Sequence, residues 1–382
     1  MTMFQLVLKN ALIAENNLAD VAVSNGRIAA IEKPGSLTAA DSYDCKGKSL
    51  LPGFIDIHNH GAAGIDVNEA DADGLVEIGR FLLSRGVCGW VPTLVPDSDD
   101  VYRRVVEAIN AVMQMPDDDV RFARILGVHF EGIFANRNMC GALRPEFFKV
   151  FTGTELKSLP RPSAGCSIMT FAPEIQGGIE LAGELKRKGW IASIGHTSAD
   201  CDTLEKAFLA GARHFTHFFN AMSGIHHRQL GVAGWALTNE EVTFDIIADG
   251  IHVDPRMLKL ATRAKSPEKT ILISDSVAPA GLGDGVFRLW GKEVRVASGR
   301  TISFPDGGIA GSVITMADAV RLMLEIGFNQ TEVSAMASLG PARLISIESD
   351  CGSIAVGKRA DLVVIGPNKE IDQVIFGGRP VM

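Results

Sequence analysis

The 382-residue sequence has little of what marks several large classes of protein. Its six scattered cysteines form no CxxC pair, which argues against a disulfide framework or a cysteine zinc site. No apolar run approaches the ~20 residues that a membrane span needs. No basic run offsets the net charge of -8, which argues against a general nucleic-acid binder. With two tyrosines and four tryptophans, nothing indicates a stacking platform.

The start of the chain carries Lys9 and Glu15, which interrupt its apolar residues before the core of a signal peptide could form. We therefore expect a cytoplasmic protein with reduced cysteines. Because the whole chain is acidic, an anionic substrate would have to be held by a local cluster of positive groups.

Both ends of the chain are typical of short strands joined by turns. The pair Asn25-Gly26 separates two alternating runs, which is a strong β-hairpin signal. The last thirty residues also alternate short apolar runs with glycine turns. We predict that residues 1–51 and 352–382 pair as a small β-sandwich domain.

Between these ends, eight apolar runs rich in β-formers alternate with stretches of helical period such as 72–86 and 202–213. This alternation predicts a parallel sheet covered on both faces, and eight units match a (β/α)8 TIM-type barrel spanning residues 52–351. A doubly wound sheet is the alternative, but no GxGxxG follows an early strand. Residues 287–304 are typical of a β excursion near the end of the barrel. The runs begin at Phe54, Trp90, Arg124, Cys166, Ile191, His214, Val242 and Thr270.

Polar side chains stand at or just after the carboxyl ends of these runs, and in a barrel all eight such ends meet on the face where active sites are built. His58 and His60 share one face of a strand, and neutral imidazoles suit Zn²⁺. An HxH pair alone is equally compatible with ordinary loop or core histidines. The regular placement of the whole set instead indicates a metal centre. The set is His58, His60, Glu131, His196, His217, Asp249, His252 and Asp275.

Four further groups have a less direct interpretation. His129 is expected to support the site or to lie in the core, and His214 to be structural, because it starts its strand. Asp56 could support the histidines or bind metal. Asp275 ends a Val/Ile/Leu strand, where an unpaired carboxylate would be costly, so we expect it to take a proton from an activated water. A salt-bridge or helix-cap aspartate is the alternative.

The loop 220–234 carries a positive cluster of His226, His227 and Arg228. Arginine suits bidentate recognition of phosphate, although a solvated surface loop has the same composition. A helix that opens at Gly311 behind a small-residue turn could also present backbone N–H groups to an anion.

Taken together, "LLPGFIDIHNHG", "GVHFEG", "IGHTSAD", "THFFNAMSG", "IADGIHVDP", "ISDSVAPAG" and "GSIAVGKRADLVV" resemble the N-acetylglucosamine-6-phosphate deacetylases of the amidohydrolase superfamily, over essentially the whole chain. The first and last motifs are shared across the superfamily, whereas THxxNAM and ADGxHV are more specific. The "HHR" loop and "GWVPTLV" are also similar to galactosamine-type relatives, so the sugar epimer stays open.

The resemblance implies a metal-dependent enzyme that hydrolyses the acetamide of N-acetylglucosamine 6-phosphate. It implies Glu131, His196 and His217 as ligands of Zn²⁺ or another divalent metal, with a second ion at His58 and His60. It implies Asp275 as the catalytic acid and base. It also implies a homodimer in which Arg228 reaches the phosphate in the neighbouring site. The implied substrate contacts are Ala142, Leu143, Asn220, Ala221, Arg228, His252, Ile309, Ala310 and Gly311.

Two positions depart from the family pattern. Ile133 replaces a proline, which we interpret as a loop adjustment. Leu143 replaces the histidine that contacts the acyl group, and leucine cannot donate a hydrogen bond to a carbonyl. Either a second metal polarises the carbonyl, or another residue does, or the acyl group and substrate differ.

Three other functions remain as alternatives. A cyclic-amide hydrolase would use a carboxylated lysine, but no lysine lies near the strand ends and Glu131 takes that place. An N-acetylgalactosamine-6-phosphate deacetylase is compatible with every residue. A non-catalytic sugar-phosphate binding protein is suggested by Leu143, and the presence of Asp275 argues against it.

Overall fold

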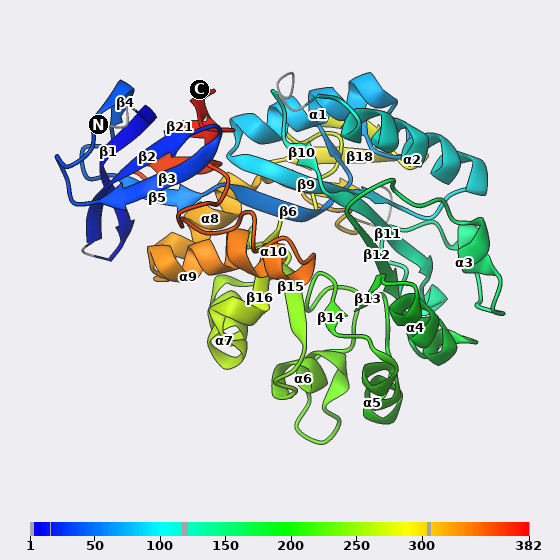
Figure 1. Ribbon diagram of the computed structural model, residues 1–382. Helices are drawn as coiled ribbons and strands as arrows, with labels where there is room; N and C mark the ends of the chain where they lie inside the picture. Colours follow the sequence, from blue (N-terminus) through cyan, green and yellow to red (C-terminus); the bar gives the residue numbers. More distant parts are fainter. Residues whose placement is uncertain (1–3, 16, 117–120, 304–306, 382) are drawn as a thin grey trace.

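A parallel barrel and a mixed sheet built from both chain ends make up the computed structural model, which describes residues 4–15, 17–116, 121–303 and 307–381 (Figure 1). The predicted fold is confirmed. The division of the chain at residues 51/52 and 351/352 stays a prediction.

The terminal sheet has the order β22-β21-β20-β5-β1-β2-β3, with β4 beside β1. The two chain ends meet where β5 pairs antiparallel with β20. Asn25 and Gly26 join β2 to β3 with φ of 52° and 70°, as a tight hairpin turn requires. The strands are β1 Phe4–Ala14, β2 Asn17–Ser24, β3 Arg27–Glu32, β4 Ala39–Asp44, β5 Ser49–Pro52, β20 Leu362–Ile365, β21 Ile371–Phe376 and β22 Arg379–Pro380.

All eight predicted barrel strands are present and pair in parallel. Every residue of β9 and β11 is buried, because helices cover the outside and side chains fill the inside. A short extra strand, β10, pairs with β9. The strands are β6 Phe54–Asn59, β9 Val87–Leu94, β10 Arg124–Ile125, β11 Gly127–Phe134, β12 Cys166–Phe171, β13 Ile191–Ile194, β14 His214–Phe215, β15 Thr243–Ile247 and β16 Thr270–Ile273.

The seam between the last strand and the first is joined just beyond the end of β16. The amide of Asp275 donates to the carbonyl of His58 at 3.0 Å, and the amide of His60 donates to the carbonyl of Ser276 at 2.8 Å. Three residues singled out from the sequence therefore join the two strands through their backbones.

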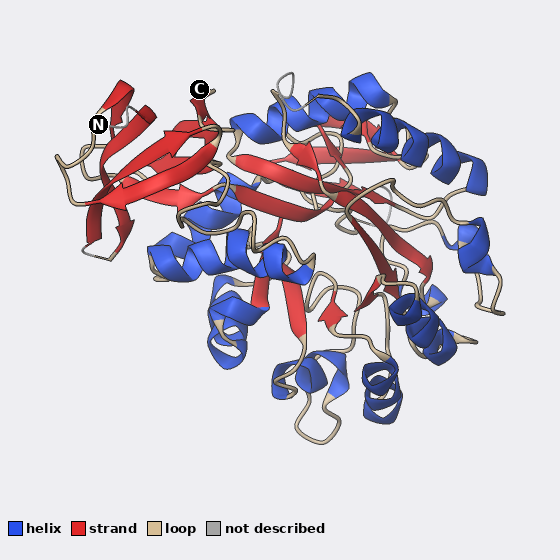
Figure 2. Ribbon diagram, viewed as in Figure 1, coloured by secondary structure: helices blue, strands red, loops and turns tan. Residues whose placement is uncertain are grey.

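Helices cover the outer face of the barrel (Figure 2). Helix α1 illustrates the local cause: the Asp71 side chain caps it by accepting from the amide of Gly74, and Leu75, Ile78 and Leu82 form its buried face. The helices are α1 Ala72–Ser84, α2 Asp99–Met113, α3 Glu155–Ser158, α4 Gly178–Arg187, α5 Cys201–Ala210, α6 Gly231–Thr238, α7 Pro255–Lys265, α8 Met316–Glu325, α9 Gln330–Ser334 and α10 Gly340–Leu344.

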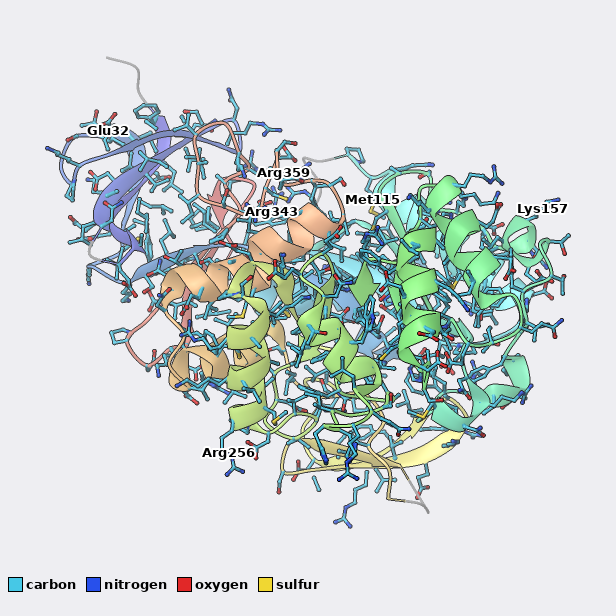
Figure 3. All side chains as sticks on the ribbon, turned by 90° about the horizontal axis from the view of Figure 1, so that it is seen from below. Glu32, Met115, Lys157, Arg256, Arg343 and Arg359 are labelled. Carbon is cyan, nitrogen blue, oxygen red and sulfur yellow. The ribbon has the colours of Figure 1, made fainter. Side chains whose placement is uncertain are left out.

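The predicted β excursion is a three-stranded antiparallel sheet of β17 Gly285–Leu289, β18 Lys292–Ala297 and β19 Arg300–Ser303. Residue 304 of the predicted range lies outside the described residues. Seen from below, the excursion (yellow) lies at the end of the barrel opposite to Arg343 and Arg359 (Figure 3). A short hairpin, β7 Gly61–Ala62 and β8 Ile65–Asp66, follows β6.

Two expectations from composition can be compared with the structure. All six cysteines are free. In the part of the chain that the structure describes, no helix has both the length and the apolar character to cross a membrane.

Candidate active site

Glu131, His196 and His217 come from three different strand ends and meet at one point. Oε1 of Glu131 lies 3.1 Å from Nε2 of His196 and 3.0 Å from Nε2 of His217. The two imidazole nitrogens are themselves 3.0 Å apart. All three side chains are buried. The resulting group of two nitrogens and one oxygen fits a divalent metal such as Zn²⁺.

His58 and His60 form a second group with the same glutamate. Their Nε2 atoms are 3.1 Å apart, and Nε2 of His60 lies 3.2 Å from Oε2 of Glu131. Oδ1 of Asp275 lies 3.4 Å from His58 and 3.3 Å from His60. Glu131 therefore stands between two sets of donors that could each hold a metal ion.

The chain leaves three barrel strands through left-handed backbone. His196, His217 and Asp275 have φ of 49°, 33° and 49°, a region that residues other than glycine rarely adopt. Such strain persists only where the surrounding structure holds it, and it concentrates at functional sites. Its repetition at three strand ends marks this end of the barrel as specialised.

Backbone carbonyl groups hold two of the imidazoles from behind, and a buried carboxylate holds the backbone at a third histidine. Nδ1 of His60 lies 3.1 Å from the carbonyl oxygen of Thr93, and Nδ1 of His196 lies 2.8 Å from that of Met139. The backbone amide of His217 donates to Asp245. The two carbonyl contacts set which ring nitrogen of His60 and His196 faces a metal. Sequence reasoning missed Asp245, although an aspartate inside the apolar run "VTFDII" is a visible signal. The contacts with backbone carbonyl groups could not be predicted, because every residue has a carbonyl group and the sequence does not show which one faces an imidazole.

The three supporting residues considered from the sequence lie around the centre. His129 is buried, with Nε2 at 2.7 Å from Oγ1 of Thr170 and its ring against His58. His214 contacts Asp245 through Nε2 at 3.0 Å. The Asp56 carboxylate accepts hydrogen bonds from Ser274 and Asn59, beside the histidine pair. None of the three belongs to the two donor groups.

The charges of the centre shift one another's pKa values. Burial opposes ionisation of Glu131, but the surrounding histidines, His58 foremost, hold its pKa well below the usual range. Burial likewise opposes ionisation of Asp275, and His58 and His60 lower its pKa. Burial alone would lower the pKa of both His60 and His217. Contacts with Asp275 and Glu131 instead raise that of His60 to about 10, and Glu131 raises that of His217 to about 9.

A cavity of about 310 Å³ opens above the centre. It is lined by Ala142, Leu143, Asn220, Ala221, His252, Ile309 and Gly311 among the predicted substrate contacts.

Ala310 and Arg228 do not line this cavity. Ala310 is buried in an apolar cluster with Val277 and Leu289. Its neighbours Ile309 and Gly311 line the cavity instead. Arg228 is exposed on its loop. The described residues that line the cavity include no Arg or Lys.

Two further observations concern loops next to the cavity. His252 lines it and pairs with Asp249, Nδ1 to Oδ2 at 2.7 Å. The helix expected to open at Gly311 begins instead at Met316, as α8. The amide of Ser312 donates to the carbonyl of Asp275, and that of Thr315 to Asp318. The anion site expected there is therefore not formed by these amides, since the local turn and the helix cap already use them.

Trp290, Ile247 and Ile251 also line the cavity, and sequence reasoning did not place them there. The two isoleucines belong to apolar runs whose facing cannot be read from hydrophobicity alone. Trp290 comes from the β excursion, and its ring stands edge-on to that of His60 with centroids 5.3 Å apart.

Comparisons with known proteins identify relatives of the chain. The amidohydrolase family model matches residues 169–381. The chain is 34% identical to the N-acetylglucosamine-6-phosphate deacetylase of Bacillus subtilis (strain 168), over 98% of this chain and 96% of that protein. It is 33% identical to the N-acetylgalactosamine-6-phosphate deacetylase of Escherichia coli O157:H7, over 94% and 93%.

A solved structure extends the likeness to the fold. It is that of a mutant N-acetyl-D-glucosamine-6-phosphate deacetylase from Mycobacterium smegmatis in complex with N-acetyl-D-glucosamine-6-phosphate, with a TM-score of 0.87 and 27% identity, covering 100% of each chain. The resemblance seen in the sequence motifs is thereby confirmed across the whole chain. The chain therefore belongs to the N-acetylglucosamine-6-phosphate deacetylase family of amidohydrolases.

Proposed function

We propose that the chain hydrolyses the acetamide of an N-acetylated amino-sugar 6-phosphate, converting N-acetylglucosamine 6-phosphate to glucosamine 6-phosphate and acetate. The observation that carries this proposal is the meeting of Glu131, His196 and His217 within 3.1 Å of one another. Asp275 lies 3.3 Å from His60, which in turn contacts Glu131 of this group, and it lines the same cavity of about 310 Å³.

Glu131, His196 and His217 would hold one divalent cation, which we propose to be Zn²⁺, and His58 and His60 would hold a second with Glu131. A cation bound there would lower the pKa of a water molecule and polarise the amide carbonyl. The donor set supports this assignment, because buried nitrogen and oxygen atoms this close together are stable only around shared protons or a metal ion.

Asp275 is the proposed catalytic acid and base. Its lowered pKa keeps the carboxylate ionised, and Oδ1 faces the metal donors at 3.3 to 3.4 Å. It accepts a proton from the attacking water as the water oxygen bonds to the carbonyl carbon. As the C–N bond breaks, Asp275 returns that proton to the nitrogen; the second proton of the water stays on the acid, which ionises as the amine is protonated to an ammonium group.

Asn220, Ala221, His252 and the segment 309–311 would hold the sugar. Ala310 would contribute through its backbone, since its side chain is buried. Ala142 and Leu143 would contact the acyl group. Leu143 donates no hydrogen bond, so we assign polarisation of the carbonyl to the metal site.

The phosphate requires a positive group, and the described lining of the cavity contains no Arg or Lys. We propose that Arg228 supplies it to the site of a second copy of the chain, in a cytoplasmic homodimer. The exposure of Arg228 on its loop supports this assignment, and its guanidinium suits bidentate phosphate binding.

A panel of substrates tests the proposed function. Purified zinc-loaded protein is expected to release acetate from N-acetylglucosamine 6-phosphate far faster than from unphosphorylated N-acetylglucosamine. N-acetylgalactosamine 6-phosphate belongs in the panel, because a 33% identical relative carries that activity in its name. If protein with full metal content binds the phosphorylated sugars but releases no acetate, it is a binding protein and the proposal is wrong.

A further inference from the structure

Trp290 stands at an unusual place in the fold. It lies in the turn between β17 and β18, with a left-handed φ of 49°, far along the chain from every proposed metal donor. Its ring meets the ring of His60 edge-on and lines the same cavity as Glu131, His196 and Asp275. The β excursion thus brings one large aromatic side chain to the metal centre.

The chemistry of an amide places its acyl chain close to this tryptophan. The reacting carbonyl carbon has to lie next to the metal donors and Asp275, and the first acyl carbon is one bond away from it. The length of the acyl group is therefore limited by the apolar side chains that stand nearest the donors. Trp290 is beside His60, and Leu143 packs on Gly132, next to Glu131.

The excursion holds Trp290 through an apolar cluster. Leu289 and Val294 of the excursion pack with Val277 and Ala310 from the barrel, and Trp290 packs against this cluster. Ala142, which lines the cavity next to Leu143, packs against the same cluster as Trp290. The polar Asn220 and His252 also line the cavity and suit a sugar.

Asp66 faces Trp290 from the hairpin after the histidine pair. Burial raises the pKa of the Asp66 carboxyl to about 6, while Asn68, His60 and the Trp290 side chain act on it in the opposite direction. Nε1 of Trp290 and Oδ2 of Asp66 are both buried, and neither atom has a hydrogen-bond partner among the described residues. They are a complementary donor and acceptor, so Asp66 can set the orientation of the indole.

We propose that Trp290 is a specificity-determining residue whose indole closes the acyl end of the cavity, and that Asp66 is its positioning residue. The proposal rests on the proposed deacetylase function and deepens it. The closed end admits an acetyl group and rejects longer acyl groups.

The test compares N-acetyl, N-propionyl and N-butyryl glucosamine 6-phosphate as substrates. In the parent protein kcat/KM is expected to fall steeply with acyl length. In Trp290→Ala the ratio of butyryl to acetyl kcat/KM should rise about 10-fold or more, since each methylene in an apolar pocket changes kcat/KM by at least that factor. Trp290→Phe, which keeps a smaller ring, should lie between. Asp66→Asn should shift the ratio in the same direction by less.

Phe287→Ala is the matched control, because Phe287 packs against the same cluster but does not line the cavity. Its acyl ratio should equal that of the parent. The proposal is wrong if Trp290→Ala lowers kcat/KM for all three substrates by one common factor. It is equally wrong if Phe287→Ala shifts the ratio as far as Trp290→Ala does.

A binding measurement separates failure of this inference from failure of the proposed function. The other tryptophans, Trp90, Trp190 and Trp235, are at most 8% exposed. N-acetylglucosamine 6-phosphate should therefore change the tryptophan emission of the parent but not that of Trp290→Phe. If the parent releases no acid but shows this difference in emission, the proposed function is wrong and the contact of Trp290 with the ligand stands. If the emission changes equally in the parent and in Trp290→Phe, Trp290 does not contact the ligand and the inference is wrong.

Discussion

Both ends of the barrel carry charged side chains, but these form one buried cluster at one end and separate, partly exposed pairs at the other. At the carboxyl end, Glu131 and Asp275 share one buried centre with four imidazoles, and no group there is more than 7% exposed. At the other end, charges meet in separate, partly exposed pairs that include Arg124–Asp361 at 2.9 Å and Arg27–Asp350 at 2.8 Å. Arg359, which also pairs with Asp350, is visible at that end in Figure 3.

This difference distinguishes charged groups that can carry out a reaction from charged groups that attach one part of the fold to another. Two opposite charges at a partly exposed surface neutralise each other and need no further ligand. Here such pairs join the barrel to the residues at the chain ends. A buried cluster in which four imidazoles each turn Nε2 toward Glu131 is incomplete without shared protons or a cation. The following changes should break or sharpen that comparison.

Asp275→Asn should have the largest effect. The variant keeps the shape of the side chain but cannot accept the proton of the attacking water, so kcat should fall by roughly 10²–10⁴-fold. Metal content, measured by atomic absorption, should stay near that of the parent. Full activity with bound metal would reject the assignment of Asp275.

In metal-free protein, the histidines at the carboxyl end of the barrel should make the free energy of unfolding fall as pH rises. In metal-free protein the pKa values of His217 and His60 are raised to about 9 and about 10. Their contribution to stability is then fully present below the unfolded pKa of about 6.5 and is lost as pH rises through these raised values. Zinc binds neutral imidazoles, so the zinc-dependent gain in Tm should instead shrink as pH falls.

Thermal unfolding with and without chelator, between roughly pH 6 and pH 10, measures both trends. A zinc-dependent gain in Tm that does not change with pH would contradict the assignment of these histidines as ligands.

Arg228→Gln should have an intermediate effect. Loss of a charged hydrogen-bond donor to phosphate should raise KM for the phosphorylated sugar by about 10- to 100-fold and leave kcat little changed. Arg256→Gln is the control, since it removes the same charge from a side chain that is 90% exposed and pairs with Asp254 (Figure 3).

Mixing variants tests whether Arg228 acts across the proposed dimer. A mixed dimer of Arg228→Gln and Asp275→Asn subunits contains one site with both Asp275 and a neighbouring Arg228. Activity at low substrate concentration should therefore recover after subunit exchange. If it does not recover in a sample shown to contain mixed dimers, Arg228 does not act between subunits.

Arg124→Gln should have the smallest effect on catalysis. Arg124 pairs with Asp361 and stacks over the Phe376 ring at 4.0 Å, so its loss should lower the free energy of unfolding by ~1–3 kcal/mol. Because this pair lies at the opposite end of the barrel, kcat/KM should match the parent. A matching loss of kcat/KM in folded protein would show that the two ends are coupled.

The eight strands, the terminal sheet and the β excursion could be predicted from the sequence, because each depends on local periodicity and turn residues such as Asn25-Gly26. The site could be predicted as far as the residues that follow strands: Glu131, His196, His217 and Asp275 converge because parallel strands end on one face. The start of α8 at Met316, and the internal use of the amides before it, could not be predicted, since those hydrogen bonds depend on partners chosen by packing.

By itself the sequence determined which polar groups stand at the ends of apolar strands, and hence the chemistry that this end of the barrel can support. Only the tertiary structure decided what surrounds that chemistry. The hydrogen bond from the His217 amide to Asp245, the packing of Ala310 with Leu289 and the approach of Trp290 to His60 all depend on elements that lie apart along the chain. Periodicity reports which side of an element is apolar, whereas such contacts depend on how whole elements pack in space.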